Sequence, residues 1–173
     1  VVTAGPTREA LDPVRFLSNR SSGKMGYELA REAYERGAEV ILISGPVELP
    51  PPAGVKVERV LSSEDMRQAV LKYYDQASVI IMSAAVSDFR FSQTGQEKIK
   101  KEDLPSALSL ERTPDILEEL GRLKRGQLLV GFAAETSEAR ARAREKMEKK
   151  KLDLIVVNDV SRQDIGFESD DNE

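Results

Sequence analysis

Short aliphatic segments alternate with amphipathic segments along most of this chain. Aliphatic runs rich in β-branched residues are typical of buried strands, and five are expected here: residues 1–3, 40–44, 78–82, 128–132 and 154–157. Apolar residues at helical spacing predict four helices: residues 24–37, 66–74, 114–124 and 137–151. Residues 55–60 alternate apolar and charged side chains instead, which favours an edge strand.

This alternation predicts an α/β fold, a Rossmann-like three-layer arrangement in which helices flank a mostly parallel central sheet. Ligands of such folds bind beyond the carboxyl ends of the strands. The residues at those ends are mostly small or polar, which would let a base or ribose approach the backbone closely. The ends concerned are Ala4-Gly5, Ser44-Gly45, Ser83-Ala84, Phe132-Ala133 and Asn158-Asp159.

Two of the expected helices have recognisable starts. Ser62 and Asp65 are spaced to cap the helix that contains residues 66–74. Pro114 is predicted to occupy the first helical position after Thr113, where its missing N–H costs nothing.

Residues 89–112 interrupt the pattern with a long, polar segment that carries Lys98, Lys100 and Lys101. Long insertions of this kind are functional lids or disordered segments. Weak alternation over residues 107–111 favours an additional strand, and we expect the whole insertion to serve as a lid or a dimerisation segment. The chain shows no internal repeat and no linker, so we expect residues 1–173 to form a single domain.

The composition of the chain limits the partners it can bind and the kinds of catalytic site it can form. The net charge of −4 gives no basic field that would draw the chain to nucleic acid or a membrane, and its aliphatic runs are too short to span a bilayer. The chain has no Cys and no His, which excludes disulfides, thiolate nucleophiles, Ser-His triads and imidazole ligands. The remaining polar residues suit phosphate and carboxylate chemistry, in which charge placement supplies most of the catalysis.

The segment Ser18–Gly26 leads directly into the first expected helix. Its hydroxyl residues and glycines could bring several backbone N–H groups to one anion, and Lys24 adds a full positive charge. The segment is equally compatible with an ordinary helix entry capped by serines. It contains neither a dinucleotide fingerprint nor a Walker loop.

Other polar residues are further candidates for a nucleotide site. Mobile lysines can neutralise a triphosphate, and Asn or Asp can read a base, a ribose or a metal-linked phosphate. Each also has an ordinary interpretation, as a solvated surface charge or a turn residue. The candidates are Asn19, Asp88, Lys98, Lys146, Lys150 and Asn158.

Taken in order, the motifs of this chain resemble those of phosphopantothenate–cysteine ligase, which in bacteria is usually the C-terminal half of a bifunctional coenzyme A biosynthesis flavoprotein. The matching segments are 3–9, 12–15, 18–26, 84–89, 98–101, 113–116, 130–136, 158–159 and 166–170. The resemblance implies a carboxylate–amine ligase that uses CTP with Mg²⁺. 4′-Phosphopantothenate is first activated to an acyl-cytidylate with release of pyrophosphate, and cysteine then displaces CMP to form an amide.

The resemblance also implies residue roles at the matching positions. Lys98 would hold the triphosphate, Asn19 would bind the acyl-nucleotide and act in its conversion, and Asn158 would contact the pantothenate part. Metal ligands stay unassigned. The implied nucleotide-binding residues are Ser21, Gly23, Gly26, Met82, Ser83, Ala84, Asp88, Lys98, Pro114, Asp115, Ile116, Leu117, Phe132, Lys146 and Lys150.

Relative to that family, the chain is expected to be truncated at both ends and to lack the decarboxylase domain with its flavin. The resemblance implies a cytoplasmic homodimer, fused in full length to the decarboxylase within a larger oligomer, with small-molecule substrates and neither nucleic acid nor membrane as a partner.

Two alternatives stay open. A dinucleotide-binding reductase domain could share the architecture, although no G-x-G-x-x-G follows the first expected strand. A non-catalytic nucleotide-binding domain would bind CTP without turnover.

Overall fold

The computed structural model describes residues 1–135 and 139–159. Its main sheet has six parallel strands in the order β10-β9-β6-β1-β4-β5. The strands are β1 (Val2–Ala4), β4 (Ile41–Ser44), β5 (Lys56–Arg59), β6 (Val79–Met82), β9 (Leu128–Glu135) and β10 (Leu154–Asp159). From β1 the chain builds outward to β4 and β5, then crosses back to β6 and builds the other half. This doubly wound order confirms the predicted α/β fold, and β5 lies at an edge as expected.

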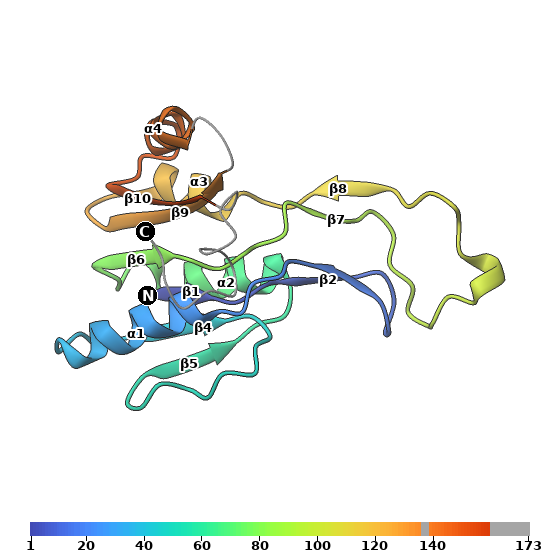
Figure 1. Cartoon of the computed structure of the whole chain (residues 1–173), viewed down its shortest axis with the longest axis horizontal. Helices are drawn as coiled ribbons and strands as arrows, with labels where there is room; N and C mark the ends of the chain where they lie inside the picture. The colour runs from blue at the N-terminus through green and yellow to red at the C-terminus, as the bar shows by residue number, and fades with distance from the viewer. Residues whose placement is uncertain (136–138, 160–173) are drawn as a thin grey trace.

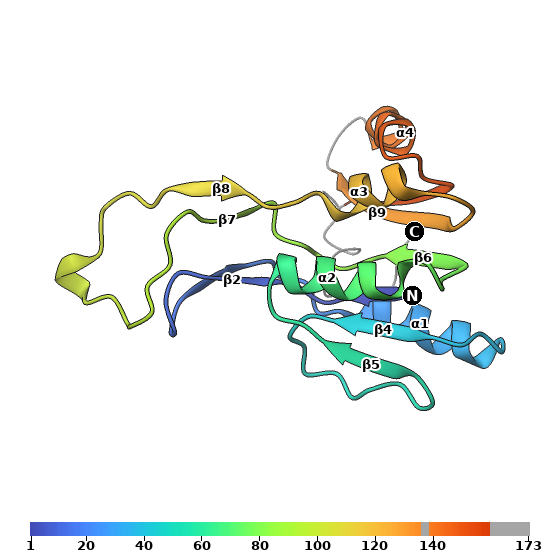
Figure 2. The ribbon, with the colours of Figure 1, turned by 180° about the vertical axis from the view of Figure 1, so that it is seen from behind.

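Helices cover both faces of this sheet (Figures 1 and 2). α1 (Lys24–Glu35) lies on one face, and α2 (Ser63–Tyr74) and α3 (Ile116–Leu123) lie on the other. α4 (Ala139–Lys149) lies beside β9 and β10. None of the helices in residues 1–135 and 139–159 is long and apolar enough to cross a membrane.

The two faces of the sheet bury separate cores. Beneath α2 and α3 the buried side chains come from both helices and from strands β4, β6 and β9; the largest of those fully buried are Ile43, Met66, Val70, Ile80, Leu120 and Leu129. Beneath α1 a smaller core joins that helix to β1 and β4; its members are Val2, Ala4, Tyr27, Ala30, Val40 and Leu42. Strands sandwiched this way are aliphatic throughout, which is why sequence patterning located them.

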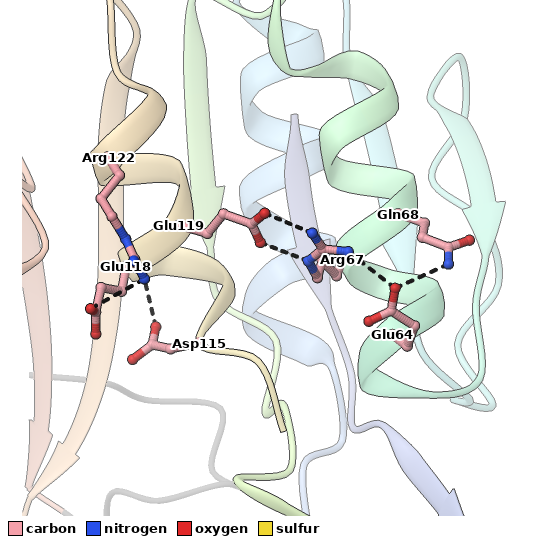
Figure 3. Close-up of polar contacts among 7 residues, drawn as sticks. All are labelled: Glu64, Arg67, Gln68, Asp115, Glu118, Glu119 and Arg122. Atoms are coloured by element: carbon pink, nitrogen blue, oxygen red, sulfur yellow. Dashed lines mark hydrogen bonds and ion pairs between the residues drawn. The ribbon is translucent and has the colours of Figure 1, made fainter. Parts of the chain in front are cut away.

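A bidentate ion pair joins the two helices of the larger face (Figure 3). The Nε and Nη2 atoms of Arg67 on α2 each lie 2.7 Å from a carboxylate oxygen of Glu119 on α3. Arg67 Nη1 also donates to Glu64, one turn earlier on α2, at 3.1 Å. Because the planar guanidinium bonds one carboxylate on each helix, it restricts how α2 and α3 slide past each other.

Two antiparallel hairpins project from the carboxyl edge of the sheet (Figure 1). One pairs β2 (Arg8–Ala10) with β3 (Phe16–Ser18), and the other pairs β7 (Phe89–Phe91) with β8 (Leu110–Arg112). Sequence patterning missed β2, β3 and β7, because these short strands are mostly exposed or half-buried and leave no aliphatic run. The strand expected at residues 107–111 lies at 110–112, where it pairs with β7 of the same chain.

The arm is the segment 89–112, which contains β7, β8 and a short 3₁₀ turn, η1 (Lys101–Asp103). It is the insertion that the sequence singled out, and it extends away from the helical layers (Figures 1 and 2).

The helix starts were predicted with mixed success. Ser62 accepts from the Asp65 N–H while the Asp65 carboxylate accepts from the Ser62 N–H, so the expected cap of α2 is confirmed. The expectation for Pro114 is wrong, because α3 begins at Ile116 with Asp115 as its N-cap. The Asp115 carboxylate accepts from the Glu118 N–H at 3.0 Å, a bond that Pro114 could not supply.

Gly26, in the first turn of α1, lies where the helix packs against the end of β1. A Cβ added to Gly26 would lie 2.5 Å from Ala4 Cβ and 2.7 Å from Thr3 O. Neither neighbour is the end of a flexible side chain, so α1 would have to move.

We therefore expect Gly26→Ala to lower the free energy of unfolding by about 1–3 kcal/mol, the usual cost of overpacking. The control is Gly126→Ala, whose added Cβ meets no atom within 4 Å. Urea unfolding of both variants measures the difference, and equal stability would show that α1 can shift at no cost.

Candidate functional site

The carboxyl ends of β1 and β6 are hydrogen-bonded to each other at the point where the strand order reverses. Pairing continues beyond both strands: the Ala85 N–H donates to Gly5 O at 2.9 Å, and the Thr7 N–H donates to Ala85 O at 3.2 Å. Pro6 and Ala85 form an isolated parallel bridge between these bonds. In doubly wound folds this switch point opens the crevice that receives ligands.

Two buried threonines hold the loop that follows β6. Thr3 Oγ1 accepts from the Ala84 N–H at 3.1 Å, and Thr7 Oγ1 accepts from the Ser87 N–H at 3.0 Å. Ser83 Oγ donates to Thr3 O at 2.6 Å, so the loop is bonded to β1 in both directions. Sequence reasoning assigned no role to these threonines; two hydroxyls within an otherwise small, apolar strand end were the available signal.

Asn19 reaches this loop from the end of the β2–β3 hairpin. Its Nδ2 donates to Ala85 O at 3.0 Å. A carbonyl oxygen can only accept, so the atom facing it must be the amide nitrogen, and Oδ1 is the atom that can accept from a ligand. Asn19 therefore lies at the switch point of the sheet.

The start of α1 lies next to the same edge. Gly23 is its N-cap with φ of 80°, and no side chain of the described residues caps the helix. The Gly23 N–H contacts Ser21 Oγ at 3.3 Å and the Lys24 N–H contacts Ser22 Oγ at 3.4 Å, both long bonds. The first N–H groups of a helix have no acceptor within the helix, so this end suits an anion.

Close backbone contacts explain the glycines around this helix start. A Cβ on Gly23 would lie 3.3 Å from Gly5 Cα, and one on Gly45 would lie 1.8 Å from Pro6 O. The loops after β1 and β4 and the start of α1 therefore meet closely, and the Val47 side chain packs against Gly5 and Gly23.

The start of α3 forms a second part of the edge. Lys150, which follows α4, places Nζ 2.8 Å from Asp115 Oδ2, so two residues assigned to the nucleotide are paired with each other. Burial raises the pKa of Asp115, but the ion pair with Lys150 and the hydrogen bond from the Glu118 N–H outweigh it, and the net shift is downward. Lys149 adds a contact of 3.4 Å with Glu118.

The remaining candidates come from different strands and loops. Met82 and Ser83 are at the end of β6, Phe132 is half-buried in β9, and Asp88 is exposed just before β7. Asn158 lies in β10, but its side chain is outside the described part of the structure.

Lys98 is not among the residues at the strand ends. It lies on the arm, where its neighbour Ile99 is hydrogen-bonded to the turn of the β2–β3 hairpin by Asp12 and Arg15. The structure thus brings together Asn19, Ser83 and Ala84 at the switch point, and it places Lys98 on the projecting arm (Figure 1).

A family model for the DNA/pantothenate metabolism flavoprotein C-terminal domain matches residues 1–173. The chain belongs to this family. It is 54% identical over 173 residues to the coenzyme A biosynthesis bifunctional protein CoaBC of Bacillus subtilis, a match that covers 99% of this chain and 43% of that protein. The chain thus spans less than half the length of this relative.

Solved structures agree with the fold. The crystal structure of the C-terminal domain of a CoaBC protein has a TM-score of 0.82 and 48% identity, covering 91% of this chain and 74% of the other. A flavoprotein of DNA/pantothenate metabolism from Streptococcus pneumoniae has a TM-score of 0.80 and 26% identity, covering 92% and 81%. A structure in complex with phosphopantothenate-cysteine has a TM-score of 0.76, and its 17% identity supports the fold alone.

The hydrogen bond from Ser87 to Thr7 can be tested with two variants. Thr7→Val keeps the shape but leaves a buried N–H without its acceptor, so we expect a loss of about 1–3 kcal/mol in the free energy of unfolding. Thr7→Ser keeps the hydroxyl and loses one methyl group, at a cost of about 1 kcal/mol. Urea titration compares them; a Val variant as stable as the Ser variant would show that the bond contributes little.

Proposed function

We propose that this chain is a phosphopantothenate–cysteine ligase domain that uses CTP in coenzyme A biosynthesis. The observation that carries the proposal is the match over 99% of the chain to CoaBC, joined to the strand order of its sheet, whose switch point is where doubly wound folds bind ligands. The relative solved with phosphopantothenate-cysteine shares the fold, which makes the same ligand chemistry a reasonable test here.

In the proposed reaction, the carboxylate of 4′-phosphopantothenate attacks the α-phosphate of CTP, and pyrophosphate leaves. The amine of cysteine then attacks the acyl-cytidylate, an amide forms and CMP leaves. The carboxylate is already ionised at neutral pH, so the first step needs alignment and charge neutralisation rather than a general base. A chain without histidine can supply both.

The edge of the sheet at the carboxyl ends of its strands offers three kinds of group for these steps. Backbone N–H groups at the start of α1, beside Ser21, Gly23 and Gly26, can bind phosphate oxygens. The loop after β6, from Met82 through Ala84 to Asp88, together with Phe132, can hold the base and ribose. The start of α3 from Pro114 to Leu117 completes the edge, with Lys146 and Lys150 contributing positive charge from the region of α4.

Asn19 has the geometry for the second step. With Nδ2 held by Ala85 O, its Oδ1 can accept a hydrogen bond from the incoming amine. Asn158, at the end of β10, is proposed to contact the pantothenate part of the substrate.

Mg²⁺ would bind together with the triphosphate. It prefers oxygen ligands and is usually held by substrate phosphates plus one or two carboxylates. Among the residues whose side chains the structure describes, no group of three or more Asp or Glu could hold a metal ion.

The arm is proposed to mediate a homodimer. It exposes large apolar side chains, Phe89, Leu108 and Leu110, and the neighbouring hairpin exposes Val14 and Phe16. Exposed apolar side chains on a projecting segment suit a contact with another chain. The relatives' bifunctional names fit fusion to a decarboxylase half.

The first test measures pyrophosphate release from CTP and Mg²⁺ with phosphopantothenate. We expect Lys98→Ala to slow it by about 10²-fold or more, since removing one group that stabilises transition-state charge has effects of that size. Lys101→Ala, on the η1 turn, is the matched control. Equal rates in Lys98→Ala and the parent would remove Lys98 from the mechanism.

The same assay separates the alternatives. Titration with ATP and NADPH in place of CTP distinguishes a different nucleotide or a reductase. CTP binding without pyrophosphate release would identify a non-catalytic domain.

The second step is tested with Asn19→Asp. The new carboxylate faces Ala85 O without a donor and loses the bond that orients it, so acyl-cytidylate should accumulate. We expect its conversion by cysteine to slow by about ten- to a hundredfold, the value of one hydrogen bond to a charged group. Quench-flow with isolated acyl-cytidylate measures this step directly, and unchanged conversion would exclude the role.

A further inference from the structure

We propose that Asp12 is a positioning residue that, together with Arg15, holds the Ile99 backbone and thereby places Lys98 for catalysis. This inference rests on the proposed ligase function in so far as it concerns catalysis. Its structural part, the attachment of the arm to the hairpin turn, can be tested without any activity.

The β2–β3 hairpin is itself firmly attached to the body of the protein. The Arg8 N–H donates to Leu61 O at 2.8 Å, and the buried Glu9 carboxylate accepts from the Ser63 N–H at 2.8 Å, at the start of α2. At the other strand, Ser18 Oγ donates to Thr7 O at 2.7 Å. The turn of the hairpin is therefore a fixed point relative to the sheet.

Asp12 lies at that turn with only 3% of its surface exposed. Its two carboxylate oxygens have different partners. Oδ1 accepts from the N–H groups of Val14 and Arg15, at 2.9 and 2.8 Å, and so builds the turn. Oδ2 accepts from the Arg15 guanidinium, with Nε at 3.0 Å, and from the Ile99 N–H at 3.2 Å. One oxygen therefore serves the hairpin, and the other links it to the arm.

Arg15 completes the link. Its Nη2 donates to Ile99 O at 2.8 Å as well as to Asp12, so both the N–H and the C=O of Ile99 are bonded to the same acid–base pair. A second contact holds the arm nearby, because the Gly95 N–H donates to Leu11 O at 2.8 Å.

The electrostatics agree with this arrangement. The Arg15 guanidinium and the surrounding N–H groups hold the pKa of the Asp12 carboxyl well below its usual range, so the carboxylate stays charged at every pH of interest. A charge this buried is retained only when all its hydrogen-bonding capacity is used, and here one of the donors comes from the arm.

The consequence concerns the lysines. Lys98 and Lys100 flank Ile99, and with Lys101 they form a run of like charges that tends to spread in solution. Holding the Ile99 peptide at both its N–H and C=O fixes the backbone from which Lys98 extends. A lysine presented from a fixed backbone loses less conformational entropy when it binds a triphosphate.

Because the two carboxylate oxygens of Asp12 have different partners, one substitution can weaken the link to the arm and leave the turn intact. Asp12→Asn keeps an oxygen to accept from Val14 and Arg15, so the turn survives. It replaces Oδ2 by an NH₂ group that faces the donors of Ile99 and Arg15 and cannot accept from either. Arg15→Lys is the second variant, because a single ammonium cannot bridge the carboxylate and Ile99 O as the guanidinium does.

Matched controls come from the same arm. Asp103→Asn changes an exposed carboxylate on the η1 turn, and Arg90→Lys changes an exposed arginine paired with Glu111. Neither contacts the hairpin turn in the described structure.

The first measurement is amide hydrogen exchange at Ile99, supported by the rate of trypsin cleavage after Lys98. We expect Asp12→Asn to accelerate both by about tenfold or more while exchange in α2 and β6 stays as in the parent, and the controls to behave like the parent. If Ile99 exchange is unchanged in both Asp12→Asn and Arg15→Lys, the link does not hold the arm and the proposal is overturned.

The second measurement is pyrophosphate release from CTP with phosphopantothenate. We expect Asp12→Asn to lower kcat/KM for CTP by about tenfold or more, with Arg15→Lys similarly affected and Asp103→Asn unaffected. Accelerated exchange with unchanged kcat/KM would overturn the positioning role. If the parent releases no pyrophosphate but Asp12→Asn still accelerates exchange at Ile99, the attachment is supported and it is the ligase function that fails.

Discussion

The structure depends on the bonding of β1 to β6 beyond the ends of both strands. These two strands are neighbours only in space, since the chain visits β4, β5 and α2 between them. Thr3 and Thr7 bond the backbone of the following loop, so the switch point of the sheet is rigid rather than splayed. A fixed edge of this kind suits the proposed reaction, whose first step needs alignment more than proton transfer.

Everything else at the site is arranged around that junction. Close-packed glycines let α1 begin against the end of β1, so the start of this helix lies at the edge of the sheet. Asn19 reaches the junction from the hairpin and bonds Ala85 O. The same hairpin holds the arm through Asp12 and Arg15, so residues far apart in sequence share one support.

Sequence patterning located the main strands and helices because burial on both faces leaves a strong aliphatic signal. It failed where that signal is weak, at the three-residue strands β2, β3 and β7. Pro114 was misplaced because a proline is typical of the first helical position, and only the structure shows that Asp115 caps α3 by bonding the Glu118 N–H. The hydrogen bond from the Ile99 N–H to Asp12 could not be predicted from the sequence, since the two residues are 87 positions apart.

The sequence by itself determined the layered α/β architecture, the polar character of the strand ends, and the family to which the chain belongs. These follow from local periodicity and from motifs whose residues are adjacent in the chain. Only the tertiary structure decided which candidates meet: Asn19 with Ala85, Lys150 with Asp115, and Lys98 apart from them on the arm. Such pairings depend on how distant segments are packed, and that information is spread over the whole core rather than contained in any one motif.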